Sequence, residues 1–155
     1  MSQYDLIVIG SGPAGQRAAI QGSKSGHRVA LIEKREVIGG ASINTGTIPS
    51  KTMREAVLHL SGFNYQNVYG VSYRVKEKIT MADLAFRVQH VIKTEVDVTQ
   101  AQLSRNGIEV LTGLASFKDP HTVVVTNSRG TNEITAETIV IATGTKPACS
   151  PKVPI

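Results

Sequence analysis

Short apolar runs and glycine-rich breaks alternate along the first third of the chain. Residues 5–9 and 28–33 are apolar runs of strand length, and the small-residue segment 13–25 between them is closed by Gly26. Continuous apolar runs are typical of strands that are buried on both faces of a parallel sheet. The pattern therefore predicts a strand, a helix and a second strand that form a βαβ unit.

Two later segments have apolar residues at helical spacing. The first contains Pro49 near its first turn, where the missing N–H costs nothing. The second is expected to have Thr80 as its N-cap with Asp83 three positions on, and to run to about residue 105 before an Asn-Gly pair. The predicted buried positions are Met53, Ala56, Val57 and Leu60 in the first helix, and Leu84, Val88, Val91, Ile92 and Val96 in the second.

Beyond the second helix, the apolar period changes to that of strands. The expected strands are 108–112, 115–118, 123–126, 133–135 and 138–141. We expect a small antiparallel meander from about 114 to 135, beside a parallel sheet with helices. The predicted fold class is therefore α/β.

Length and composition are those of one folded unit. The chain has 155 residues, of which 41% are hydrophobic, so it can bury one core. No stretch approaches the roughly 20 apolar residues of a membrane span, and the N-terminus enters an apolar strand instead of a signal sequence. We therefore expect a cytoplasmic location and no membrane partner.

The charged and metal-binding residue types favour no macromolecular or metal partner. The net charge is +5, but the 17 Lys and Arg residues are scattered, and the segment 65–78, which mixes aromatic and basic residues, matches no nucleic-acid module. Cys149 is the single cysteine and supports no disulfide within the chain. The four histidines lack metal-ligand spacing. We expect no nucleic-acid partner and no metal site.

The first strand leads into a glycine-rich loop, Gly10-Ser11-Gly12-Pro13-Ala14-Gly15, which fits the pattern G-x-G-x-x-G. The first glycine of such a loop permits a tight turn, the second lets the backbone approach a pyrophosphate, and the third lets helix and strand pack closely. The start of the helix then offers free N–H groups and positive potential to phosphates. The context predicts dinucleotide binding, with a plain glycine-rich turn as the alternative.

Glu33 ends the second strand at close to the spacing of about 20 residues expected for a ribose-binding acid. A carboxylate there would accept hydrogen bonds from both ribose hydroxyls and would repel a 2′-phosphate. NADP is therefore disfavoured at this site, and FAD or NAD remains. The alternative is a surface glutamate.

Two further motifs favour FAD. The segment 38–51 resembles the redox-active segment of the pyridine nucleotide–disulfide oxidoreductase family, and Ala142-Thr143-Gly144 resembles that family's second FAD motif. The resemblance implies that residues 1–145 form a Rossmann-like FAD-binding domain and that 146–155 lead toward a separate NAD(P)-binding domain. It also implies small-molecule dinucleotide partners, with NADP and NAD as substrates, and a homo-oligomeric parent protein.

The disulfide enzymes of that family have cysteines at the positions of Ser42 and Thr47. Hydroxyls cannot form a disulfide or a charge-transfer thiolate, so reducing equivalents would pass directly between flavin and nicotinamide. The segments 44–57 and 69–76 are most similar to the soluble, Si-specific pyridine nucleotide transhydrogenases. Many of these retain the first cysteine, so Ser42 is a departure even within that branch.

The resemblance also implies roles for single residues. Lys51 would lie at the reactive edge of the flavin, where a cation stabilises the reduced ring; the alternative is a solvated lysine. Ser42 and Thr47 either donate hydrogen bonds near the flavin or fill the space of the absent thiols. The expected cofactor-binding residues are Gly10, Gly12, Pro13, Ala14, Gly15, Glu33, Lys34, Gly40, Ala41, Ser42, Thr47, Lys51, Ala115, Ala142, Thr143 and Gly144.

Three functions stay open from the sequence. The chain is part of an enzyme that transfers hydride from NADPH to NAD⁺ through FAD, part of a dihydrolipoamide dehydrogenase-like protein, or a stand-alone nucleotide-binding module. The first is the function that the motifs favour.

Overall fold

Parallel strands form the centre of the fold. In a computed structural model that describes residues 3–146, β1 (Tyr4–Ile9) pairs in parallel with β2 (Val29–Glu33) on one side and with the second half of β6 (Gly130–Ile141) on the other. β3 (Glu109–Thr112) pairs in parallel with β2. The full strand order within these residues is β3-β2-β1-β6-β5-β4. The βαβ unit predicted from the apolar runs is confirmed.

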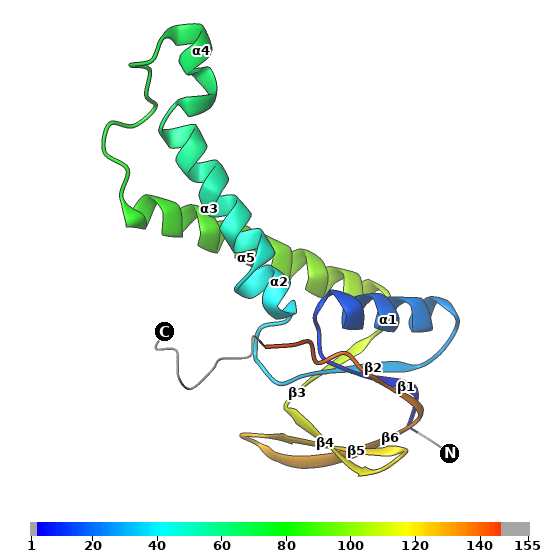
Figure 1. The fold of residues 1–155 in the computed structure, drawn as a ribbon. Helices are drawn as coiled ribbons and strands as arrows, with labels where there is room; N and C mark the ends of the chain where they lie inside the picture. The colour runs from blue at the N-terminus through cyan, green and yellow to red at the C-terminus, as the bar shows by residue number, and fades with distance from the viewer. Residues whose placement is uncertain (1–2, 147–155) are drawn as a thin grey trace.

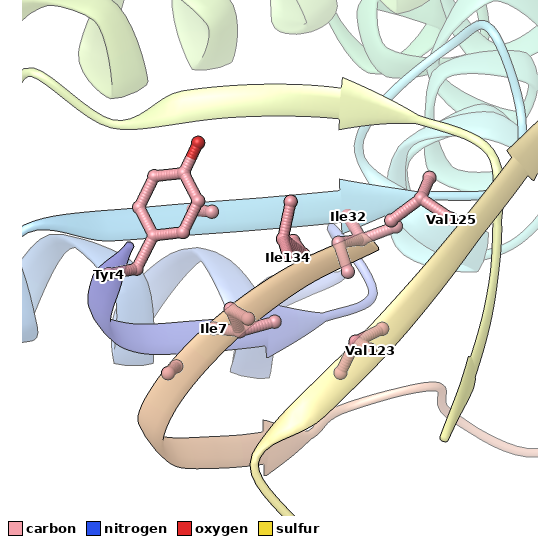
Figure 2. Packing of buried hydrophobic residues seen from close by; sticks show 8 residues of the cluster. Tyr4, Ile7, Ile32, Val123, Val125 and Ile134 are labelled. Atoms are coloured by element: carbon pink, nitrogen blue, oxygen red, sulfur yellow. The ribbon is translucent and has the colours of Figure 1, made fainter. Parts of the chain in front are cut away.

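The antiparallel meander packs against one face of the parallel strands. β4 (Leu114–Asp119) and β5 (Thr122–Asn127) pair with each other, and β5 pairs with the first half of β6. Side chains from both layers form an apolar cluster between them (Figure 2). Ile7 and Val123 are fully buried in this cluster, and Ile134 is 1% exposed.

One part of the strand prediction is wrong. Residues 133–135 and 138–141 were expected as separate strands, but β6 is continuous over 12 residues. Ala136 lies where β6 changes partner: its N–H donates to the carbonyl of His121, and it stands opposite Tyr4 of β1. Because hydrogen bonds continue through this residue, the chain passes from the meander to the parallel sheet without a turn.

Helices cover the other face of the parallel strands (Figure 1). α1 (Pro13–Lys24) and α5 (Met81–Arg105) pack there on a second apolar cluster that includes Val8, Leu31 and Leu103. The predicted buried face of α5 is confirmed. Leu84 and Val88 are buried, and Val91, Ile92 and Val96 are partly buried.

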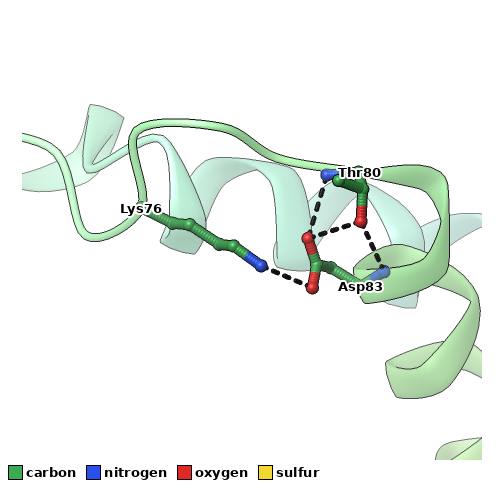
Figure 3. Close-up of polar contacts among 3 residues, drawn as sticks. All are labelled: Lys76, Thr80 and Asp83. Carbon is green, nitrogen blue, oxygen red and sulfur yellow. Dashed lines mark hydrogen bonds and ion pairs between the residues drawn. The ribbon is translucent and has the colours of Figure 1, made fainter.

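The start of α5 is fixed by the predicted cap (Figure 3). The Thr80 hydroxyl accepts the Asp83 N–H at 3.3 Å, and the Asp83 carboxylate accepts the Thr80 N–H at 2.9 Å. Lys76 Nζ adds an ion pair to Asp83 at 2.6 Å. This hydrogen bond from Lys76, followed by those from Thr80, lowers the pKa of Asp83 to about 2.

The segment between β2 and α5 is helical and extends away from the sheet (Figure 1). α2 (Gly40–Asn44) comes first in this segment, and α3 (Thr47–Leu60) follows it. A short 3₁₀ helix (Phe63–Tyr65) and α4 (Gln66–Tyr69) then lead toward α5.

The expected buried face of α3 is wrong at two of its four positions in the described part of the chain. Met53 is 37% and Val57 39% exposed, while Ala56 and Leu60 are partly buried. The reason is that α3 packs along α5 and lies beyond the sheet, so it has no second layer to cover it. Apolar spacing alone does not reveal whether a partner surface is present.

The predicted linker 146–155 lies outside the described residues except for Lys146, as does Cys149. Within residues 3–146, no helix combines the length and apolar character needed to cross a bilayer.

Candidate dinucleotide-binding site

The motifs found in the sequence meet at one edge of the sheet. Gly10 directly follows β1, Glu33 ends β2, and Ala142 directly follows β6, and these three strands are adjacent and parallel. β2 follows β1 on one side of it, whereas β6 lies on the other side, so the strand order reverses next to β1. Open α/β sheets bind ligands outside the carboxyl ends of the strands at such a switch point.

Two glycines of the loop are required by the fold itself. Gly10 has φ +107°, and a Cβ there would lie 2.4 Å from the carbonyl oxygen of Ala142. A Cβ on Gly15 would lie 1.8 Å from the carbonyl oxygen of Gly10. No side chain fits at either position. Gly10 and Gly15 therefore pack the loop, α1 and the end of β6 closely together, as predicted.

Gly12 differs from both. Its φ is −66°, which any residue adopts, and a Cβ there would meet nothing within 4 Å among the described residues. Gly12 is also the N-cap of α1, where it provides no side-chain hydrogen bond. The first N–H groups of the helix, which begins at Pro13, therefore lack a capping side chain within residues 3–146. Open space and free N–H groups coincide at this point.

The Glu33 carboxylate is buried beside the loop, with 7% of the residue exposed. Its Oε2 accepts the Ser11 N–H at 3.1 Å and the Ser11 hydroxyl at 2.5 Å, and its Oε1 accepts the Arg35 N–H at 3.1 Å. Burial acts to raise the pKa of this carboxyl, but the hydrogen bonds from Ser11 and from the two residues after Glu33 outweigh it and lower that pKa. The group is held as a carboxylate.

The segment that follows β2 returns to the glycine loop. Gly40 has φ +62°, and a Cβ there would lie 2.8 Å from Cα of Gly12. The N–H of Gly39 donates to the Ser11 hydroxyl at 3.0 Å. The Asn44 amide donates to the carbonyl oxygens of Ile38 and Gly40 at 3.0 and 2.9 Å. These contacts fix the second predicted motif against the first.

Ser42 and Thr47 lie on the two sides of a closed turn. Ser42 is partly buried in α2, and Thr47 is the exposed first residue of α3. Between them, the Gly46 N–H donates to the Ala41 carbonyl at 2.7 Å. Lys51 is exposed one turn further along α3, and within residues 3–146 its ammonium has no ion-pair partner.

The remaining predicted residues lie around this edge with different surroundings. The Gly113 N–H donates to the Glu33 carbonyl at 2.9 Å and so brings the start of β4 to the end of β2, while the Ala115 side chain is partly buried against the meander core. Ala142 packs on the helix-side cluster, and its N–H donates to the Ile9 carbonyl at 2.8 Å. Besides Thr47 and Lys51, the exposed predicted residues are Pro13, Ala14, Lys34, Ala41, Thr143 and Gly144.

Sequence reasoning missed Ser11 and Asn44. Ser11 occupies the variable second position of the glycine pattern, so the pattern carries no information about its side chain. Asn44 was given no role, whereas its amide donates to two carbonyl oxygens of the preceding segment. A polar residue that is fully buried, as Ser11 is, can be recognised only in the structure.

Two hollows in the surface lie apart from the glycine loop. One of about 440 Å³ is lined by residues of β3, β5, the β5–β6 turn and the first half of β6, together with Glu36. The other, of about 650 Å³, lies between α3 and α5. Neither is lined by residues 10–15, so the site at the strand ends is defined by its backbone geometry and by Glu33.

The family model described as pyridine nucleotide-disulphide oxidoreductase matches residues 4–154. A relative from Mycobacterium tuberculosis named soluble pyridine nucleotide transhydrogenase is 53% identical over 150 residues, which are 96% of this chain and 32% of that protein. A relative of the same name from Colwellia psychrerythraea is 37% identical over 145 residues, covering 93% of this chain and 31% of that protein. The chain thus spans about a third of the length of these relatives.

A solved structure gives the same result for the fold. The HOCl-induced flavoprotein disulfide reductase RclA from Escherichia coli is 30% identical, with a TM-score of 0.76 over 96% of this chain and 30% of that one. Its Cu(II) complex superposes with a TM-score of 0.79. The predicted Rossmann-like α/β fold is confirmed.

Proposed function

Since this chain belongs to the pyridine nucleotide-disulphide oxidoreductase family, we propose that its glycine loop binds the pyrophosphate of FAD and that Glu33 binds the adenosine ribose. The observation that carries this proposal is Gly12. Neither its backbone conformation nor any described neighbour requires glycine there, so the missing side chain is explained by a ligand that approaches the backbone.

The residues at the strand ends fit an ADP moiety. The uncapped N–H groups at the start of α1 offer hydrogen bonds and positive potential to phosphate oxygens. The Glu33 carboxylate accepts hydrogen bonds from ribose hydroxyls and repels a 2′-phosphate, which favours FAD or NAD over NADP at this site. Lys34, Ala115 and the segment Ala142-Thr143-Gly144 complete the proposed binding residues around it.

The segment that contains α2 and the start of α3 is proposed to face the flavin. Bound FAD supplies a two-electron acceptor and donor of hydride. Lys51, whose ammonium has no partner in the described residues, is proposed to stabilise negative charge at the flavin edge. Gly40 and Ala41 are proposed to contact the cofactor through their backbone, and Ser42 and Thr47 through hydroxyls or packing.

The absence of thiols at Ser42 and Thr47 argues against the disulfide chemistry of this family. Neither side chain forms a disulfide, so residues 42 and 47 cannot carry electrons to a disulfide substrate. We therefore propose that the whole protein transfers hydride from NADPH to NAD⁺ through FAD, which agrees with the name of the relatives. Residues 1–145 would be its FAD-binding domain and 146–155 a linker toward an NAD(P)-binding domain, in a cytoplasmic homo-oligomer.

The experiment uses the protein expressed from its complete gene and loaded with FAD. Under anaerobic conditions, NADPH is expected to reduce the flavin, and an NAD⁺ analogue with a distinct absorbance is expected to reoxidise it in a ping-pong cycle. A matched Ser42→Cys/Thr47→Cys variant serves as the comparison for disulfide substrates. A wild-type protein that accepts NADPH electrons but passes them only to a disulfide or a quinone would exclude the transhydrogenase function.

A further inference from the structure

The side chain of Ser11 is the most deeply buried polar group at the strand ends, and the glycine motif assigns it no role. The residue is 0% exposed. Its hydroxyl donates to Glu33 Oε2 at 2.5 Å and accepts the Gly39 N–H at 3.0 Å, while its own N–H also donates to Glu33 Oε2 at 3.1 Å. One residue therefore contacts both the acidic residue that ends β2 and the turn that leads to Gly40.

We infer that Ser11 is a positioning residue, whose hydroxyl fixes the Glu33 carboxylate in the orientation that binds ribose and ties the Gly39 turn to it. This inference rests on the proposed role of Glu33 as the ribose ligand. The hydroxyl acts as donor and acceptor at once, which is within the capacity of a serine side chain. An alanine at this position can do neither.

The consequence of losing the hydroxyl follows from burial. Glu33 Oε2 would lose the hydroxyl hydrogen bond and keep the one from the Ser11 N–H, although 93% of the residue is shielded from water. The N–H of Gly39, which is buried, would lose its acceptor. Buried groups without partners are unfavourable, so the carboxylate and the turn would both shift toward other partners or water. The Glu33 carboxylate would then lie away from the position in which it accepts hydrogen bonds from the ribose hydroxyls.

Ser23, near the end of α1, provides a control. The Ser23 hydroxyl donates to the carbonyl of Asn106 and so joins the end of α1 to the end of α5. Ser23→Ala also removes a tertiary hydrogen bond made by a serine hydroxyl, but at the opposite end of α1 from the loop that holds Ser11. A loss of stability is therefore expected in both Ser11→Ala and Ser23→Ala, whereas a loss of ribose recognition is expected only in Ser11→Ala.

The test uses the protein expressed from its complete gene and freed of flavin. Calorimetry measures the dissociation constants of ADP and of 2′,3′-dideoxy-ADP, which lacks both ribose hydroxyls, and thermal unfolding monitors the fold. Ser11→Ala is expected to weaken ADP about tenfold, in line with the loss of a hydrogen bond to a charged group, and to leave dideoxy-ADP unchanged. Ser23→Ala is expected to change neither. Ser11→Gly, which also lacks the hydroxyl, is the second variant and is expected to match Ser11→Ala.

The outcomes separate this inference from the proposed function. If Glu33→Ala abolishes the preference for ADP over dideoxy-ADP while both Ser11 variants retain it, the positioning role of Ser11 is overturned and the role of Glu33 stands. An equal loss of both ligands in the Ser11 variants also overturns it, because the loop as a whole would then have been disturbed. A wild-type protein that binds both ligands equally overturns the ribose role of Glu33, and the inference with it.

Discussion

Replacing Gly12 by valine tests the phosphate site without disturbing the fold. The position has φ −66°, and a Cβ would meet no described atom within 4 Å, so the side chain points into open space. That space lies at the start of α1, where the pyrophosphate is proposed to bind. Gly12→Val should therefore exclude the ligand and leave the folded chain nearly as stable as before.

The expected effect of Gly12→Val on ligand affinity is much larger than its effect on stability. Hydrogen bonds to a charged group contribute about 1.5–3 kcal/mol each, so the loss of two phosphate contacts corresponds to about 3–6 kcal/mol, or roughly a hundredfold to ten-thousandfold in dissociation constant. The stability cost is that of exchanging glycine for a poor N-cap residue, about 1 kcal/mol or less. For a chain of this size, 1 kcal/mol shifts Tm by about 2–4 °C.

Gly15→Ala is the matched comparison from the same loop. Its Cβ would lie 1.8 Å from the carbonyl oxygen of Gly10, so the backbone must move. Overpacking of this kind typically costs about 1–3 kcal/mol. Calorimetric titration with ADP and thermal unfolding should therefore separate the variants. Gly12→Val loses ligand affinity and lowers Tm by at most about 2–4 °C, whereas Gly15→Ala lowers Tm further. Unchanged ADP affinity in Gly12→Val would show that the loop does not hold the phosphates.

Three further changes probe the ribose acid, the helix cap and the core. Glu33→Ala should weaken ADP binding by about 1.5–3 kcal/mol through lost ribose hydrogen bonds; an unchanged dissociation constant would return Glu33 to a structural role. Lys76 and Thr80 lower the pKa of Asp83 from 3.8 to about 2. The stabilisation of the folded state by the Asp83 carboxylate is therefore fully present above the pKa that Asp83 has in the unfolded chain, and it is lost as the pH falls through about 2. The free energy of unfolding of Asp83→Asn should lack that pH dependence. Equal slopes of this free energy against pH in the variant and the wild type would contradict the cap. Ile134→Ala, at a site 1% exposed, should cost about 2–5 kcal/mol in denaturant unfolding, and a loss below about 1 kcal/mol would contradict its place in the core.

Local signals were sufficient for the elements that carry the site. The apolar runs that became β1 and β2, and the glycine loop between them, specify their structure through neighbours in sequence. The pair Thr80 and Asp83 was expected to form a cap from its spacing alone, and both predicted hydrogen bonds are present. Such features depend on contacts between residues that are close in the sequence, so they can be predicted from residue types and spacing.

Features that depend on distant partners were not predictable in the same way. The continuity of β6 requires Tyr4 and His121 beside Ala136, residues far away in sequence. The exposure of Val57 depends on whether another layer covers α3, which its apolar spacing cannot reveal. The contact of Ser11 with Glu33 likewise joins residues that only the packing of β1 beside β2 brings together.

Hydrogen bonds hold the turn between Ser42 and Thr47 in shape without a disulfide. The Ala41 carbonyl accepts the N–H groups of Thr45 and Gly46 at 3.0 and 2.7 Å, and the Asn44 amide holds two carbonyl oxygens on the other side. Because these bonds are made by the backbone and by one amide, a disulfide is not needed to set the geometry that leads into α3 and to Lys51. The exchange of thiols for hydroxyls therefore removes a redox group and leaves the architecture of the segment in place. The segment can therefore take part in the proposed hydride transfer between flavin and nicotinamide, which needs no thiol of its own.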